Sequence, residues 1–219
     1  MVWKKILYTL FCICWIGINY SGSQNVSGSK LDSTSATEVI KKVYRKYNAT
    51  YELTGRNDNP LIVTINKSFR IHLQSAYCGS SLYYICNEAG FDLEIPKSKA
   101  PVARNWGLYG ETIWSQYNGW KQGVSKTPRT NEIYVLLFNN NGRYHVGVIL
   151  EFHGGINFIT GEGNTSDSSV RTNDYLYYDN TKTNRKDIYL VKKGRQGLFA
   201  GKERYNSKGL YKIIRYTVR

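Results

Sequence analysis

Three consecutive β-strand patterns separated by tight turns constrain the fold more than any other feature of the chain. Segments rich in β-branched and aromatic residues cover Ile133–Phe138, Tyr144–Phe152 and Ile156–Gly161. The turn sequences between them are Asn139-Asn140-Asn141-Gly142 and His153-Gly154-Gly155, which are typical of hairpins. Because short hairpin turns join antiparallel neighbours, the pattern predicts an antiparallel meander.

Helical patterns precede the meander, so the expected fold class is α+β. Ser35 and Glu38 fit a capping box at the start of an amphipathic helix that we expect over Thr37–Tyr47. A second helix is expected from about Cys78 to Glu88, ending at Gly90. Its inward stripe would consist of Cys78, Leu82, Ile85, Cys86 and Ala89. Further strands are expected at Asp174–Tyr178, Asp187–Val191 and Leu210–Val218. Residues 91–130 are expected to form a loop and short helices along one side of a cleft.

The N-terminus has the order of a secretory signal. Met1–Lys5 carries two lysines, Ile6–Ile18 is an apolar run, and small and polar residues follow as far as Gln24. The apolar run is shorter than the roughly 20 residues that a spanning helix needs. A buried N-terminal helix is the alternative interpretation. We therefore predict a signal peptide at 1–23, a linker at 24–35 and one domain at 36–219, exported to the periplasm or beyond the cell, with no transmembrane anchor after cleavage.

Removal of the signal leaves Cys78 and Cys86 as the cysteines of the mature chain. If both lie on one helix, eight residues apart, their Cα atoms are ~12 Å from each other at about 1.5 Å per residue. A disulfide needs less than about 7 Å. We therefore expect two free thiols in an oxidising compartment. Free thiols are unusual there, which suggests that at least one of them has a function.

Cys78 is placed where a cysteine becomes reactive. The unpaired N–H groups and the dipole at a helix N-terminus stabilise a thiolate. The same N–H groups are suited to bind an oxyanion, and Gln74 is a weaker side-chain candidate for that role. Taken alone, however, a cysteine such as Cys78 is more often a small core residue.

A base and an acid for this thiol are expected on the second hairpin. If Gly154-Gly155 forms a two-residue turn, Gly147 faces Glu162 and His145 faces Asn164. His145, Glu162 and Asn164 then emerge on one face, with Glu162 diagonal to His145. We expect His145 to act as the base for Cys78, oriented by Glu162 or Asn164. A register change of one residue would move Glu162 to the opposite face.

The chain also has tryptophans in residues 91–130, the segment expected to form a loop and short helices. Trp106, Trp114 and Trp120 are candidates to line a substrate groove, and hydrophobic packing of a long loop explains them equally well. The histidines outside the expected site have no metal-ligand spacing, so no metal and no other cofactor is expected.

Three segments resemble one known family. Ala76–Ile85 (AYCGSSLYYI), Tyr144–Ile149 (YHVGVI) and Thr160–Ser166 (TGEGNTS) are similar to the nucleophile, histidine and Glu-Gly-Asn segments of CHAP domains, the cysteine, histidine-dependent amidohydrolases/peptidases. The resemblance covers roughly residues 60–170, and the residues from 171 to 219 would be a basic C-terminal extension. It implies a papain-like cysteine peptidase fold, with the nucleophile at a helix N-terminus packed on an antiparallel half-barrel.

The resemblance also implies an activity. CHAP-like enzymes hydrolyse amide bonds in peptidoglycan, as an N-acetylmuramoyl-L-alanine amidase or as a peptide-crosslink endopeptidase. Catalytic roles would fall to Cys78, His145 and Glu162, with Asn164 supporting the site. A cysteine peptidase acting on proteins would share the same site.

The charge of the chain indicates an anionic partner. Lys and Arg number 30 against 16 Asp and Glu, for a net charge of +14. Residues 182–219 hold twelve basic and two acidic residues, a net of +10. With the resemblance, we expect peptidoglycan and an anionic wall polymer as partners, no nucleic acid, and a monomer. The alternative is an exported basic module that binds wall polymer or nucleic acid and has a degenerate catalytic site.

Overall fold

The computed structural model describes residues 34–47, 50–52, 56–72, 75–166, 174–178, 188–192, 196–204 and 209–219. The predicted signal peptide and most of the predicted linker lie outside these residues. The elements follow in the order α1 (Ala36–Lys46), β1 (Thr50–Tyr51), α2 (Pro60–Ser68), α3 (Cys78–Glu88), the 3-10 helix η1 (Ala103–Gly107), β2 (Glu111–Ser115), β3 (Gly119–Trp120), β4 (Glu132–Asn140), β5 (Arg143–Phe152), β6 (Phe158–Ser166), β7 (Asp174–Tyr178), β8 (Ile188–Lys192), β9 (Gln196–Arg204) and β10 (Leu210–Thr217). Within the described residues, none of the helices combines the length and apolarity needed to span a bilayer.

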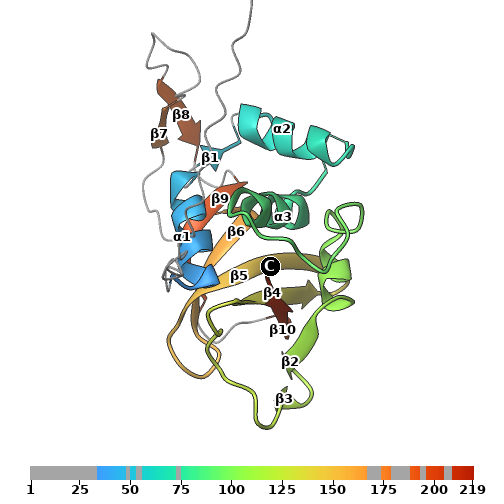
Figure 1. Ribbon diagram of the computed structural model, residues 1–219. Helices are drawn as coiled ribbons and strands as arrows, with labels where there is room; N and C mark the ends of the chain where they lie inside the picture. Colours follow the sequence, from blue (N-terminus) through green and yellow to red (C-terminus); the bar gives the residue numbers. More distant parts are fainter. Residues whose placement is uncertain are drawn as a thin grey trace, which may run out of the picture. The chain divides into compact units, whose positions relative to one another are not determined.

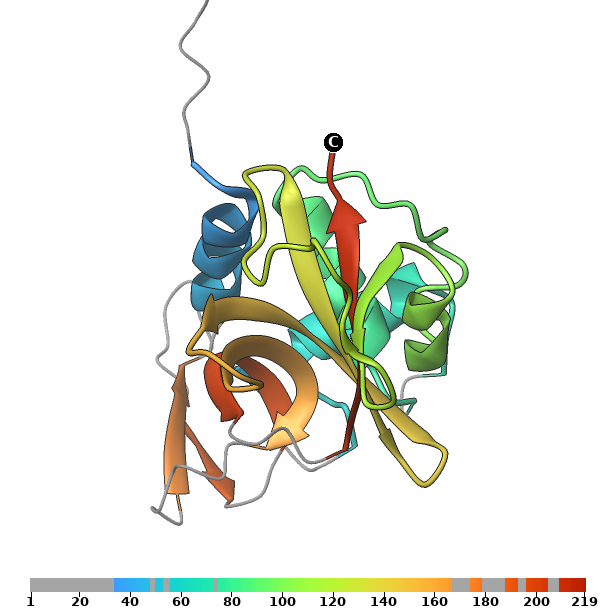
Figure 2. The same ribbon diagram turned by 90° about the horizontal axis from the view of Figure 1, so that it is seen from below.

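An antiparallel sheet forms the centre of the fold, in the order β1-β9-β6-β5-β4-β10-β2-β3, while β7 and β8 pair separately. Helices α1 and α3 lie on one side of it (Figure 1). The meander expected from the sequence is present, since β4 pairs with β5 and β5 with β6. The α+β class is confirmed. Seen from below, the end of the sheet formed by β6 and β9 coils strongly (Figure 2).

Strand β4 is buried on both faces, which explains its unbroken apolar sequence. Its odd-numbered residues Ile133, Val135 and Leu137 pack with the buried faces of α1 and α3. Its even-numbered residues Tyr134, Leu136 and Phe138 pack in a second core on the opposite face. The segment that follows β3 covers that second core, and the Tyr134 hydroxyl donates to the Ser125 carbonyl (2.9 Å). The sheet therefore separates two hydrophobic cores.

The two helices expected from the sequence form nearly where predicted. Ser35 Oγ accepts a hydrogen bond from the Glu38 N–H (3.3 Å), the cap that the sequence predicts for α1. Helix α3 covers the predicted residues and ends before Gly90, which has a φ of +79°. The predicted inward stripe of α3 is buried except at Ala89, which is partly buried.

Other elements differ from the prediction. Helix α2 was not expected, although Asn59 caps it and Pro60 occupies its first position. Residues 91–130 contain the short helix η1, in agreement with the expected loop and short helices, but also the strands β2 and β3, which were not expected. Their strands are short, with Gly119 at a φ of +65°, so local periodicity is weak.

The largest correction concerns the C-terminal part of the chain. The segment 171–219 is not an appendage to a core at 60–170, because β10 is inserted between β4 and β2. Strand β9, which was not expected, pairs with β6 over its full length. Both are long-range pairings, and a local sequence pattern carries no information about which strand becomes the neighbour.

Candidate active site

The N-terminus of α3 positions the first candidate residue. Cys78 is the first residue of this helix and is 3% exposed. Among the described residues, no side chain caps α3, so the first backbone N–H groups of the helix keep their hydrogen-bonding capacity. A Cβ at Gly79 would lie 2.2 Å from the Ala100 carbonyl oxygen, so only glycine lets the start of the helix pack against that backbone.

The second hairpin places His145 and Glu162 in the expected relation. Gly147 is registered opposite Glu162, as the sequence predicts. The turn itself is longer than the predicted two residues, because the His153 N–H donates to the Asn157 carbonyl (3.0 Å). An irregularity between Ile149 and Glu151 shifts the register back by one residue. The two deviations cancel, so His145 and Glu162 remain on one face.

Hydrogen bonds saturate the carboxylate of Glu162, which is completely buried. His145 Nε2 lies 2.7 Å from Glu162 Oε2, and Thr160 Oγ1 donates to Oε1 (2.7 Å). Arg204 on β9 binds both carboxylate oxygens, through Nε (2.7 Å) and Nη2 (2.5 Å). A buried carboxylate with this set of donors is held in one orientation.

Close approach at Gly147 makes this arrangement possible. A Cβ at Gly147 would lie 2.7 Å from Glu162 Cγ, and a side chain there would displace the carboxylate from the imidazole. On the neighbouring strand, the Phe138 ring lies beside His145, with centroids 6.0 Å apart, and beneath Arg204, whose Cζ is 4.8 Å from the ring centroid. The imidazole and the guanidinium are thus packed as well as hydrogen-bonded.

The environment favours charged forms of His145 and Glu162. Burial alone would lower the pKa of His145, but its interactions with Cys78 and Glu162, which include the hydrogen bond that the Glu162 carboxylate accepts, raise it to about 9. Burial alone would raise the pKa of Glu162, but the bonds and charges of His145 and Arg204 hold it well below its usual range. At neutral pH the pair is therefore an imidazolium beside a carboxylate.

The Cys78 side chain adjoins this pair, because it is among the groups that raise the pKa of the His145 ring. Because Nε2 of His145 is bonded to Glu162, Nδ1 is the ring nitrogen that remains for the sulfur. Sulfur, imidazole and carboxylate then follow one another, from α3, β5 and β6. Cys78 and Cys86 are both free thiols. Cys86 lies eight residues further along the helix and is fully buried, and this burial raises the pKa of its thiol.

The remaining polar candidates are not part of this cluster. Asn164 has a left-handed φ of +57° at an irregularity of β6, and the pairing of β5 with β6 ends at Gly147 and Glu162, before it could face His145. The prediction that His145 faces Asn164 is wrong, since β6 bends away from β5 at this point. Gln74 lies outside the described residues.

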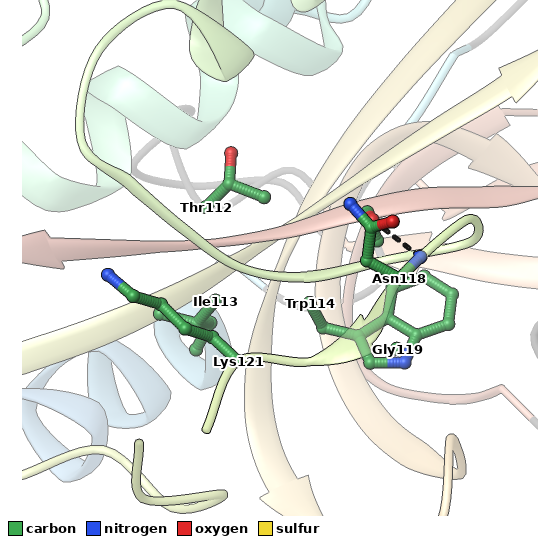
Figure 3. A pocket seen from close by; sticks show the side chains of 7 residues that line it. Thr112, Ile113, Trp114, Asn118, Gly119 and Lys121 are labelled. Atoms are coloured by element: carbon green, nitrogen blue, oxygen red, sulfur yellow. Dashed lines mark hydrogen bonds between the residues drawn. The ribbon is translucent and has the colours of Figure 1, made fainter. Parts of the chain in front are cut away.

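The three tryptophans do not line a common groove. Trp106 is completely buried, with its indole N–H donating to the Ala100 carbonyl (2.8 Å), so the groove prediction is wrong for this residue. Trp114 and Trp120 are registered opposite each other on β2 and β3 and pack on the second core. Trp114 borders a pocket of about 340 Å³ together with Asn118 and Lys121 (Figure 3). Strands β4 and β10 separate that part of the sheet from β5.

Sequence reasoning missed Arg204 and Thr160. Thr160 could have been found, because it lies two residues before Glu162 on the same strand and so on the same face. Arg204 belongs to the segment that appeared to be a basic extension, and only the pairing of β9 with β6 brings it to Glu162.

No family model, no curated protein and no solved structure matches this chain.

Proposed function

We propose that this protein is an exported peptidoglycan hydrolase that cleaves an amide bond by a Cys-His-Glu mechanism, in the manner of CHAP domains with their papain-like arrangement. The observation that carries the proposal is the alignment of Cys78, His145 and Glu162, with the thiol on the first turn of a helix. The three sequence segments that resemble CHAP domains contain these same residues.

The chemistry follows from the charges of the cluster. The imidazolium of His145 and the N-terminus of α3 both stabilise negative charge on the Cys78 sulfur. The thiolate attacks the amide carbonyl, and the backbone N–H groups at the start of α3 are placed to bind the tetrahedral oxyanion. His145 then gives its proton to the leaving amine as the C–N bond breaks, and a thioester forms.

Deacylation uses the same residues. Neutral His145 takes a proton from a water molecule, which attacks the thioester carbonyl. The C–S bond breaks, the carboxylic acid is released, and the proton returns the ring to the imidazolium. Glu162, held by Arg204, keeps the imidazole in the orientation that both steps require.

Replacement of each cysteine by alanine tests the proposal. Purified wild-type protein is incubated with isolated cell walls, and released fragments are identified by mass spectrometry, whose new termini name the bond cut. Cys78→Ala should abolish release, whereas Cys86→Ala removes a free thiol from the same helix and should retain it. Circular dichroism checks that both variants fold.

Three outcomes would contradict the proposal. Wall digestion by the folded Cys78→Ala variant would rule out the thiol mechanism. Salt-dependent binding to walls, without any thiol-dependent cleavage by the wild-type protein, would favour the alternative basic binding module. Cleavage of protein substrates in place of walls would favour a cysteine peptidase with the same site.

A further inference from the structure

The large apolar side chains that are exposed lie around one pocket. Among the residues that the structure describes, these side chains are Val102 (48% exposed), Leu108 (75%) and Tyr117 (76%). Val102 and Leu108 flank η1 at its two ends, and residues of η1 line a pocket of about 330 Å³ together with Leu108. Tyr117 contacts Tyr211, another residue of the pocket lining, with ring centroids 6.3 Å apart. Such a concentration of exposed apolar groups is typical of a binding surface.

Three tyrosines form a continuous aromatic surface at this pocket, here called the tyrosine surface. Tyr211 on β10 contacts both Tyr117 and Tyr144, and the centroids of the Tyr211 and Tyr144 rings are 6.5 Å apart. Tyr144 and Tyr211 are half-buried and pack against the core that contains the buried faces of α1 and α3. Tyr144 directly precedes His145 on β5, and successive side chains of a strand point to opposite faces. The tyrosine surface is therefore separate from the candidate active site.

Two cations lie beside the tyrosine surface without a counter-ion. Arg104 and Lys212 line the pocket, and neither forms an ion pair with a carboxylate of the described residues. They differ in this from Arg204 and Arg215, which bind carboxylates within the fold. Lys212 Nζ lies 5.4 Å from the centroid of the Tyr211 ring. A ligand that complements the pocket therefore has a negative charge next to an apolar face.

The strand order and the sparse charge narrow the class of ligand. A peptide that adds a strand to a sheet needs an unpaired strand edge, but β10 is paired on both sides, with β4 and β2. A single-stranded nucleic acid has a phosphate in every unit, and the grooves that bind it have cations along the backbone. Here two cations accompany three tyrosines. This ratio suits a sugar polymer, whose rings have apolar C–H faces and whose acidic groups occur on only some units.

We propose that the tyrosine surface, with Arg104 and Lys212 beside it, binds an acidic polysaccharide. The sugar rings pack on the tyrosines, and the two cations bind a carboxylate of the polymer. Asn105, also in the lining, donates its amide N–H to the Lys99 carbonyl (2.9 Å), and its amide oxygen can accept a hydrogen bond from a sugar hydroxyl. This binding goes beyond the proposed hydrolysis and does not involve Cys78.

Binding of two related oligosaccharides tests this inference. The full chain is titrated at low salt with a hyaluronan tetrasaccharide, which has a carboxylate on every second sugar, or with the tetramer of N-acetylglucosamine, which has no carboxylate, and binding is followed by NMR. We expect the hyaluronan tetrasaccharide to bind about two- to tenfold more tightly, from two partly exposed ion pairs. Arg104→Gln and Lys212→Gln should each reduce that preference. Tyr117→Ala should weaken the binding of both oligosaccharides by a similar factor, because the ring contacts the sugar and not its charge.

Lys126→Gln is the matched control. The Lys126 ammonium also lies over an aromatic ring, that of Trp120, at 6.0 Å from its centroid, but Trp120 packs on the second core. This variant removes the same charge as Lys212→Gln and should leave the preference for the carboxylate unchanged.

The outcomes distinguish this inference from the proposed hydrolysis. Equal binding of the two oligosaccharides, no binding of either, or a preference that persists in the double variant of Arg104 and Lys212 would overturn the inference even if Cys78-dependent wall cleavage is found. A thymidine tetranucleotide that binds more tightly than the hyaluronan tetrasaccharide, and loses affinity in the same variants, would assign the surface to single-stranded nucleic acid instead. A preference that depends on Arg104 and Lys212 supports the polysaccharide site even if no wall cleavage is found.

Discussion

Cys78 and Glu162 both raise the pKa of the His145 imidazole, and a substitution at Glu162 removes its share without changing the sulfur. Glu162→Gln keeps the size of the side chain and some of its hydrogen bonds but removes the charge that favours the imidazolium. Burial of the ring, which lowers the pKa, is unchanged by the substitution. We therefore expect the pKa of His145 to fall from about 9.

The size of the fall follows from the geometry. The two charged atoms are 2.7 Å apart, and an opposite charge at such a distance shifts a pKa by roughly 1–3 units, each worth about 1.4 kcal/mol. A fall of about two units would reduce the protonated fraction of His145 at pH 8 from about nine-tenths to about one-tenth. In the proposed mechanism the leaving amine takes this proton, so the alkaline limit of the proposed hydrolysis should move to lower pH in the variant.

NMR titration of the histidine Cε1 protons measures this pKa without any substrate. The chain has three histidines, and loss of one signal in His145→Asn assigns the relevant resonance. Glu111→Gln is the matched control, because Glu111 also pairs with an arginine, Arg215, but on β2. A His145 signal that titrates below pH 7 in the wild-type protein, or that Glu162→Gln leaves in place, would refute the coupling.

Three further outcomes follow from the same contacts. Iodoacetamide should modify Cys78 and spare Cys86 in the native protein, since Cys86 is fully buried and burial raises the pKa of its thiol. Peptide mass spectrometry of the native Cys78→Ser variant should then find no label at Cys86. Gly147→Ala should lower the free energy of unfolding in urea by about 1–3 kcal/mol, because its Cβ would lie 2.7 Å from Glu162 Cγ, and an unchanged midpoint would contradict the close packing. The raised pKa of His145 stabilises the folded state by roughly 3 kcal/mol at most. This contribution is fully present below about pH 6.5 and is lost as the pH rises through about 9. The free energy of unfolding in urea should therefore depend less on pH over this range in His145→Asn than in the wild-type protein.

The local parts of the fold could be predicted from the sequence because local interactions specify them. The cap at Ser35, the start of α3 at Cys78 and the β4–β5–β6 meander depend on residues close in the chain. The register at Glu162 was predicted correctly although the turn was not. A longer turn shifts the pairing by one residue, and the irregularity near Leu150 shifts it back. Only positions beyond that irregularity keep the predicted pairing.

Burial of aromatic residues could not be predicted in the same way. Trp106 has a polar indole and lies between prolines, which is compatible with an exposed loop. It is buried because the Ala100 carbonyl accepts its N–H and the Tyr216 hydroxyl donates to its own carbonyl (2.6 Å). Tyr216 comes from β10, more than a hundred residues later, so no local pattern reports this contact.

Arginines of the C-terminal strands form ion pairs within the fold, so the net charge of this segment overstates the charge that is open to a partner. Arg204 and Arg215 belong to the segment with a net charge of +10, yet Arg204 binds the buried Glu162, and Arg215 binds Glu111 and lies 3.6 Å from Glu132. Part of the basicity therefore balances carboxylates inside the sheet and is not available to an anionic polymer.

The same strands also make the predicted core at 60–170 incomplete. Without β10, strands β4 and β2 would lose their shared neighbour, and both cores would lose buried residues, among them Ile213 and Ile214. Without β9, the carboxylate of Glu162 would keep His145 as a partner but lose the arginine that binds both of its oxygens. A buried carboxylate that loses such a partner costs several kcal/mol, about as much as a domain of this size has to spare. The cluster of Cys78, His145 and Glu162 and the C-terminal strands β9 and β10 therefore form a single folding unit, and the geometry of the cluster depends on a segment that, judged by composition alone, looks dispensable.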